Sequence, residues 1–170
     1  GYGNIDRNTG EADSEVYEYS TDTGSLICAS CDRGGARPVG SAFIGSTLRH
    51  LASTPFHQPR VLSDDGERLF FSSPDPLVAG GSSPHAKLYE YEQDGVGSCA
   101  TEGGCLYLIS SGANEADDVF LDASSNGDDL FFATLSRLAP TDQDDLVDVY
   151  DARVGGGFAG QAAPATCATT

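Results

Sequence analysis

The chain holds 170 residues, enough for one domain with a hydrophobic core, and 39% of them are apolar. Lysine and arginine total 9 against 26 aspartates and glutamates, and this net charge of −17 argues against binding to nucleic acid or to anionic membrane surfaces. No run of about 18 apolar residues is present, so no membrane insertion is predicted. Because the first residue is Gly1 rather than Met, we expect a piece of a longer protein.

Short segments rich in Val, Ile, Leu, Phe and Tyr alternate with clusters of Gly, Asp, Asn, Ser and Pro, a pattern typical of many short β-strands. Helical periodicity is nearly absent. Nine strands are predicted, in chain order: Glu15–Ser20, Leu26–Ala29, Arg60–Ser63, Glu67–Ser73, Lys87–Glu92, Cys105–Ser110, Asp118–Asp122, Asp128–Thr134 and Val147–Arg153.

A repeat organises the second half of the chain. The segment Leu69–Phe71 matches Leu130–Phe132, Gly66 matches Gly127 and Tyr89 matches Tyr150, each at a distance of 61 residues (for example 127 − 66). Self-similarity at a fixed period predicts a repeat architecture, and repeat modules usually present binding surfaces. The pairs Asp65-Gly66 and Asn126-Gly127 predict two-residue hairpin turns within the two copies.

The order of strands predicts the last two strands of one unit, a complete four-stranded unit and three strands of another. The expected organisation is an end of a preceding unit at 1–31, an irregular connecting loop at 32–57, a complete unit at 58–111, a partial unit at 112–157 and a flexible tail at 158–170.

The segment LSDDGERLFFSS and its copy ASSNGDDLFFAT, followed by KLYEY and DVYDA respectively, resemble TolB-type β-propeller repeats, sometimes described as WD-repeat-like. The resemblance implies an all-β fold of consecutive four-stranded antiparallel blades, here about two and a half blades of an incomplete β-propeller. It also implies a bacterial extracytoplasmic protein, with the remaining blades of the parent chain as partners. The chain lacks Trp and the Gly-His and Trp-Asp signature of cytoplasmic WD repeats.

The five cysteines favour disulfide bonds over metal binding, because no histidine lies near either close pair. Cys99 and Cys105 bracket a short Gly-rich loop, and a disulfide between them would imply an oxidising compartment. Cys28 and Cys31 can bridge only if the chain bends at Ala29-Ser30, since three residues of extended strand hold their Cα atoms too far apart. Cys167 is left without an assigned partner.

No cofactor is expected apart from a candidate calcium ion. Alternating oxygen ligands suit calcium, and the loops before two of the Tyr-containing strands are acidic. The first loop offers Asn4, Asp6, Asn8 and Glu15, and the third offers Asp142, Asp144, Asp145 and Asp148. Of these, the assigned candidate ligands are Asp6, Asn8, Glu15, Asp142, Asp144 and Asp145. The middle loop, AGGSSPHAK, has lost the acids. A solvated acidic turn is the simpler interpretation of both loops.

The tyrosines Tyr17, Tyr89 and Tyr150 recur on equivalent strands. Packing between blades is their first interpretation, and recognition of a protein or glycan partner is the second. No nucleophile elbow, zinc-protease or phosphate-loop motif is present, so no catalytic residue is assigned. We therefore expect a non-catalytic scaffold that binds a macromolecule. The alternatives are an accessory propeller of a larger secreted hydrolase or lyase, and a calcium-stabilised structural repeat.

Overall fold

The computed structural model describes residues 3–45 and 58–156, and within these ranges the chain forms eight β-strands and no helix. The all-β expectation is therefore confirmed for the described residues. Nothing in them could cross a membrane as a helix. Residues 46–57 of the expected connecting loop lie outside the described residues, as do the expected tail at 158–170 and Cys167 within it.

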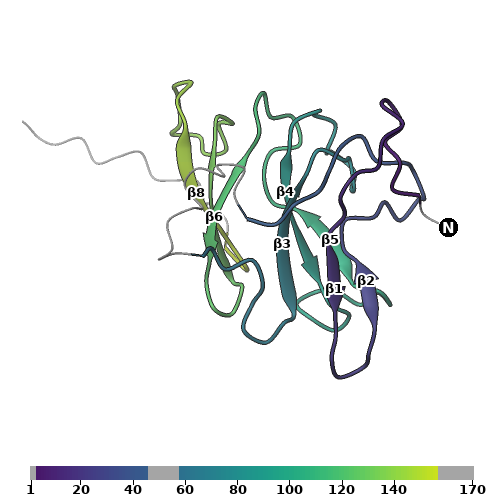
Figure 1. The fold of residues 1–170 in the computed structure, drawn as a ribbon. Helices are drawn as coiled ribbons and strands as arrows, with labels where there is room; N and C mark the ends of the chain where they lie inside the picture. Colours follow the sequence, from purple (N-terminus) through teal and green to yellow (C-terminus); the bar gives the residue numbers. More distant parts are fainter. Residues whose placement is uncertain (1–2, 46–57, 157–170) are drawn as a thin grey trace, which may run out of the picture.

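The strands form three small antiparallel sheets that stand side by side and do not close into a ring (Figure 1). The first sheet has two strands and the others have three each, with neighbours in chain order paired. The strands are β1 (Tyr17–Tyr19) and β2 (Leu26–Cys28), then β3 (Arg68–Ser73), β4 (Lys87–Glu92) and β5 (Cys105–Leu108), then β6 (Val119–Ala123), β7 (Asp129–Thr134) and β8 (Asp148–Arg153).

Eight of the nine expected strands are therefore present, with ends shifted by at most two residues. The exception is Arg60–Ser63, which forms only an isolated bridge between Leu62 and Leu69. Backbone hydrogen bonds from Phe70 N to Val61 O (2.8 Å) and from Ser63 N to Arg68 O (2.9 Å) still hold this segment along β3. The middle sheet is thus three-stranded with a bridged edge segment, rather than fully four-stranded as expected.

The turns at Gly66 and Gly127 are longer than the two-residue hairpins that the sequence predicts. Both glycines have positive φ (77° and 73°), but no non-glycine residue in the described ranges does, so Asp65 and Asn126 do not adopt the conformation that a two-residue turn requires. Instead, Ser63 N bonds Arg68 O and Ser124 N bonds Asp129 O, which closes a loop of four residues in each copy. The two copies share this turn, so the repeat extends to its backbone geometry.

The middle sheet is buried on both faces, because another sheet packs against each of them. One face contributes Leu69, Phe71, Tyr89 and Tyr91 to a core shared with the first sheet. Alternation along the strands directs Phe70 and Leu88 to the opposite face. There they join a core shared with the third sheet, formed with Phe120, Ala123, Leu130 and Phe132. All six residues of β4 are consequently buried.

The same aromatic contact recurs in both copies of the repeat. Phe71 stacks on Tyr89 with ring centroids 5.7 Å apart, and Phe132 contacts Tyr150 at 6.0 Å. Both pairs join neighbouring strands in equivalent register. The equivalence of the copies is therefore a matter of packing as well as of sequence.

Replacement of a residue in the doubly covered strand should be far more costly than the same change on a loop. We expect Leu88→Ala to lower the free energy of unfolding by about 2–5 kcal/mol, because Leu88 is buried between two sheets. The matched control is Leu146→Ala, at a leucine that is 70% exposed, with an expected loss under about 0.5 kcal/mol. Urea unfolding of both variants measures this, and equal losses would contradict the stacking of the sheets.

Candidate functional site

The long loops that precede β1, β4 and β8 lie at one end of the three sheets, at the top of Figure 1. These are the loops in which the sequence places its candidate ligands. The loops before β4 and β8 have the same length, because the repeat runs through them without a gap. Their equivalent positions can therefore be compared directly.

The loop before β4 surrounds a buried ammonium group. Lys87, the only lysine of the chain, donates from Nζ to the carbonyl oxygens of Pro74 (2.8 Å), Ser83 (2.6 Å) and His85 (2.9 Å). Burial lowers the pKa of Lys87, and the nearby carboxylates of Asp75 and Asp118 oppose that shift. The loop before β4, whose segment AGGSSPHAK has lost the acids, thus surrounds a cation supplied by its own chain.

Asp148 takes the place of Lys87 in the third sheet, since Lys87 pairs with Ser73 and Asp148 pairs with Thr134 in the equivalent register. Carboxylate oxygens of Asp142, Asp144 and Asp148 lie within 4.8 Å of one another. An open hollow of about 810 Å³ lies beside them. The structure therefore gathers the candidate ligands Asp142 and Asp144 with Asp148, an acid that the sequence also places in this loop.

Two further contacts involve acids of this loop, one to Asp142 and one to Asp145. Tyr150 donates its hydroxyl hydrogen to Asp142 Oδ2 at 2.6 Å. The third predicted ligand, Asp145, instead accepts from Arg137 at 2.5 Å, and its side chain is exposed. Asp145 therefore belongs to a surface ion pair.

In the first loop, the side chain of the predicted ligand Asp6 is engaged by the backbone. Asp6 accepts backbone hydrogen bonds from Thr9 (2.7 Å) and Asn8 (2.5 Å), and these bonds lower the pKa of its carboxyl group. The guanidinium of Arg37 donates to the carbonyl oxygens of Ile5 (2.8 Å) and Asp6 (2.7 Å). Backbone donors and the guanidinium of Arg37 thus hold this loop.

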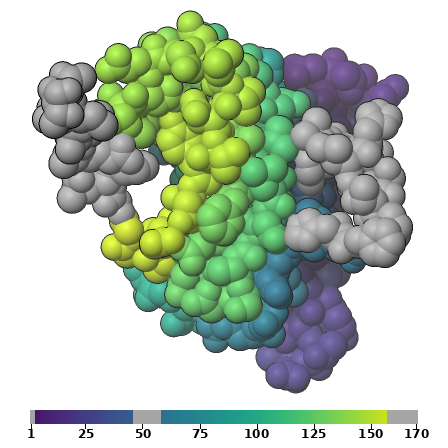
Figure 2. Space-filling view, turned by 90° about the vertical axis from the view of Figure 1, so that its left-hand side faces the viewer, coloured from purple at the N-terminus to yellow at the C-terminus, as the bar shows by residue number. Residues whose placement is uncertain are grey.

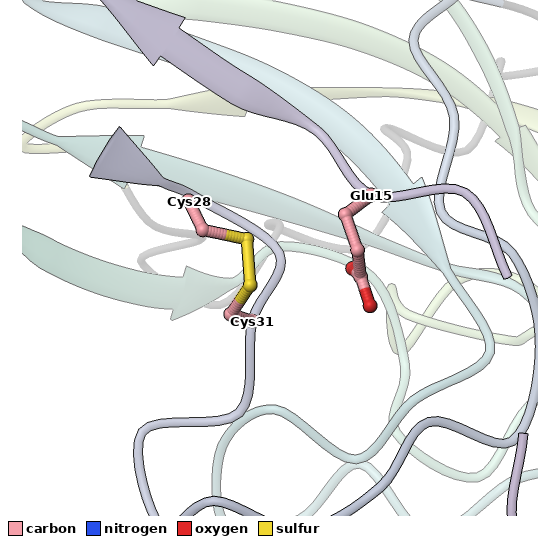
Figure 3. Close-up of side chains that lie close together, drawn as sticks. All are labelled: Glu15, Cys28 and Cys31. Carbon is pink, nitrogen blue, oxygen red and sulfur yellow. A yellow bond between two sulfur atoms is a disulfide. The ribbon is translucent and has the colours of Figure 1, made fainter. Parts of the chain in front are cut away.

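Glu15 lies elsewhere, beside Cys28 and Cys31 (Figure 3). Its carboxylate accepts the Ser30 hydroxyl hydrogen at 2.5 Å. The two sulfur atoms beside it are joined in a disulfide, so they are not the thiolates that a metal would require. This group is therefore not a metal site.

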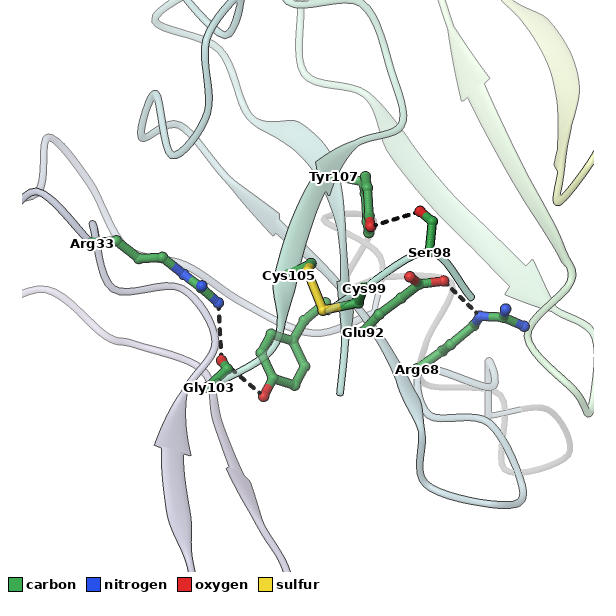
Figure 4. Close-up of a disulfide and its surroundings, with 9 residues drawn as sticks. Arg33, Arg68, Glu92, Ser98, Cys99, Gly103, Cys105 and Tyr107 are labelled. Carbon is green, nitrogen blue, oxygen red and sulfur yellow. Dashed lines mark hydrogen bonds and ion pairs between the residues drawn. A yellow bond between two sulfur atoms is a disulfide. The ribbon is translucent and has the colours of Figure 1, made fainter. Parts of the chain in front are cut away.

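Two disulfides are present among the described residues. Cys99 and Cys105 are joined across the β4–β5 loop with Cα atoms 5.6 Å apart, as the sequence predicts (Figure 4). In the same loop, the carbonyl oxygen of Gly103 accepts from Arg33 (3.0 Å) and from the Tyr91 hydroxyl (3.2 Å). Arg33 belongs to the loop that follows the first sheet. The disulfide therefore lies where this loop contacts the middle sheet.

Cys28 and Cys31 are also joined, with Cα atoms 5.4 Å apart. The bond is feasible because β2 ends at Cys28 and the chain bends at Ala29-Ser30, the condition that the sequence sets for it. Disulfides persist in oxidising compartments. Together, the two bonds indicate an extracytoplasmic protein.

The three predicted binding tyrosines do not share a surface. Tyr89 is fully buried and donates to the carbonyl oxygen of Asp75 at 2.6 Å, so it has no area left for a partner. Tyr150 is half-buried against Phe132. Tyr17 is 53% exposed on the outer side of the first sheet. Tyr89 and Tyr150 therefore have the packing role. Among the three predicted tyrosines, Tyr17 has a side chain that a partner could reach.

A buried charge cluster between the middle and third sheets was not predicted. Arg68 lies within 3.1 Å of Glu92, 3.3 Å of Glu90 and 2.6 Å of Asp128, the last from the neighbouring sheet. The third sheet has a related triad in which Arg153 pairs with Asp129 (2.5 Å) and Asp151 (2.7 Å). Spacing by 61 residues equates Arg68 with Asp129 and Glu92 with Arg153, so the signs are exchanged between the copies. That exchange is the sequence signal that would have revealed the cluster.

No family model, curated protein or solved structure matches this chain. Its function must therefore be inferred from its own residues and packing.

The cluster predicts a pH-dependent stability. Burial, followed by repulsion from Glu92, raises the pKa of Glu90 from 4.5 to about 7, whereas Arg68 opposes the shift. The Glu90 carboxyl group of the folded chain thus binds its proton more tightly than that of the unfolded chain. The protonated carboxyl group therefore stabilises the fold at low pH, and this stabilisation is lost as the pH rises from about 4.5 to 7.

Glu90→Gln removes this titration. Between about pH 5 and pH 8, the free energy of unfolding of the wild type should fall relative to the variant by up to about 3 kcal/mol. Urea unfolding at a series of pH values measures the difference. Parallel curves for the two proteins would show that Glu90 is not a buried titrating group.

Proposed function

We propose that this chain is a non-catalytic segment of a TolB-type β-propeller that serves as an extracytoplasmic scaffold for binding a macromolecule. The main support is the stacking of antiparallel sheets of common register, with the middle sheet buried on both faces. Stacked modules of this kind build an extended surface rather than an enclosed catalytic pocket. The two disulfides support a secreted or cell-surface location.

The loop end of the sheets is the surface that we assign to the partner. The loops before β1 and β8 gather exposed carboxylates there, including Glu11 and Asp145. Charge complementarity speeds association and selects partners, so this end favours a partner with a cationic surface. We propose a protein as that partner, with a glycan as the second choice.

A binding screen with charge variants tests this proposal. The chain is applied to arrays of extracellular proteins and of glycans, and a ligand is taken forward to titration. Neutralising the loop end with Glu11→Gln and Asp145→Asn should weaken binding at least about tenfold. The control neutralises two exposed acids in the opposite hairpin turns, Asp22→Asn and Asp94→Asn, and should leave the affinity unchanged.

Equal effects of the two variants would remove the loop end as the binding surface, and no bound macromolecule at all would contradict the scaffold. The chain is also incubated with ester, glycoside and peptide substrates. Turnover above that of a heat-denatured sample would replace the scaffold with the hydrolase alternative.

A calcium-stabilised repeat is the second candidate function, favoured by a specific contrast between the two equivalent loops. The middle loop is held by the ammonium of Lys87, which contacts three backbone carbonyl oxygens. The third loop has Asp148 at that position and gathers it with Asp142 and Asp144. Oxygen ligands of this kind suit calcium, which would there replace the lysine cation.

We expect added calcium to raise the melting temperature of the chain by several degrees and EDTA to reverse the rise, because a ligand that binds only the folded state stabilises it. Asp144→Asn combined with Asp148→Asn should abolish the response. The control Asp94→Asn, at an exposed turn of the middle sheet, should keep it. An unchanged melting temperature in wild type would contradict calcium binding.

A further inference from the structure

A small cleft lies between the first and middle sheets, at the end of the molecule opposite the long loops. Its volume is about 190 Å³, and its walls come from the β1–β2 hairpin, from the end of β4 and from the glycines before β5. Figure 1 shows this hairpin at the bottom of the view, and in Figure 2 it is the purple projection at the lower right. We call this cleft the hairpin cleft.

Both walls of the hairpin cleft belong to sheets that already pack on each other. Ile27 lines the cleft and also packs against the core that the first and middle sheets share. Gln93 closes the side toward the turn before β3, because its Nε2 donates both to Glu18 Oε1 and to the carbonyl oxygen of Gly66 (2.9 Å). The cleft is therefore part of an interface within the chain, and it is not an outer sheet face.

Glu18 supplies a carboxylate to the interior of the cleft. Its Oε1 accepts from Gln93, whereas its Oε2 is buried and accepts no hydrogen bond from the described residues. Burial raises the pKa of the Glu18 carboxyl group, and the hydrogen bond from Gln93 opposes this shift. A buried acceptor without a donor destabilises the fold, and more so when it is charged. A ligand that donates to Oε2 would relieve this cost.

The other polar groups of the lining favour a cation. Asp94 adds a second carboxylate, and neither lysine nor arginine is among the described residues that line the cleft. The hydroxyl groups of Thr23 and Ser25, 2.7 Å apart, offer acceptor oxygens beside them. Arg33 lies outside the lining, although its guanidinium donates to the carbonyl oxygen of Gly103 (3.0 Å; Figure 4). The net charge of −17 adds a long-range attraction for cations.

The size and the acceptors of the cleft suit an organic ammonium ion better than a metal. A volume of 190 Å³ equals about six water molecules at about 30 Å³ each, which admits a short carbon chain. Calcium takes six to eight oxygen ligands, and the described acids close enough to share a metal lie elsewhere. A primary ammonium group carries a positive charge and three donors. The ammonium of Lys87, bound by three carbonyl oxygens, shows that this chain can surround such a group.

We propose that the hairpin cleft binds a small primary ammonium ion, which donates to Glu18 Oε2 and to hydroxyl oxygens of the hairpin. The same chemistry is available from a free amine and from the end of a lysine side chain. This site goes beyond the proposed scaffold function, because that function uses the loop end of the sheets.

Titration of the ¹⁵N-labelled chain with n-butylamine hydrochloride, followed by NMR, tests the proposal. We expect saturable shifts of the Gln93 side-chain amide and of the backbone amides of Gly103 and Gly104, with a Kd of about 1 mM. Neutral n-butanol and NaCl of equal ionic strength should each bind at least about tenfold more weakly, because neither brings a charged donor. Nα-acetyl-lysine methylamide separates the two sources: tighter binding than butylamine assigns the site to a lysine side chain, and weaker binding to a free amine.

Glu18→Gln keeps the size of the side chain and removes its charge, so it should weaken butylamine binding at least about tenfold. The matched control Glu11→Gln removes an exposed acid at the loop end and should bind like wild type. Circular dichroism verifies that both variants fold. Saturating butylamine should also lower the pKa of the Glu18 carboxyl group, measured by ¹³C NMR, since a bound cation favours the ionised form.

Three results would overturn the ammonium site: no saturable shift at these amides, equal binding of butylamine and butanol, or equal losses in the two variants. None of them affects the proposed scaffold function, because its own test is the titration of charge variants at the loop end.

Discussion

The structure depends on the covering of the middle sheet from both sides. A sheet of three short strands cannot bury both its faces by itself, and an isolated hairpin is at best marginally stable in water. Here every residue of β4 is enclosed, with Tyr89 and Tyr91 directed to one neighbour and Leu88 to the other. Cohesion therefore comes from contacts between sheets. Since each sheet contacts only its neighbours, stability is shared along the stack as in other repeat proteins.

Enclosing a strand in this way forces polar groups to find partners inside. Lys87 begins β4 and is fully buried, and its cost of desolvation is offset by three carbonyl oxygens of the preceding loop. At the other end of the strand, Glu90 and Glu92 share Arg68. The acidic third loop differs because β8 is covered on one side only, so its carboxylates face water and are available to an added cation.

The sequence predicts much of this fold, since strand formation and the 61-residue repeat are local or periodic signals. The Cys99–Cys105 bond also follows from spacing, whereas the stacking of Phe71 on Tyr89 within one sheet was not predicted. The hairpin turns were mispredicted because Asp65 and Asn126 keep negative φ and the glycine alone takes the left-handed conformation. The site was only partly predictable. The sequence places four acids in the third loop, but only the folding of that loop decides that Asp142, Asp144 and Asp148 come together while Asp145 pairs with Arg137. Asp6, in the first loop, is engaged by its own backbone.

The exchange of charges between the two copies bears on how the chain avoids folding wrongly. Repeats of similar sequence are prone to exchange strands, with one unit pairing with part of another. If β3 paired with β8 in the native register, Arg68 would lie opposite Arg153, and β7 paired with β4 would place Asp129 opposite Glu92. Like charges directly opposite each other destabilise a strand pair. The exchanged charges thus favour pairing of each strand within its own sheet over pairing with the equivalent strand of the other copy.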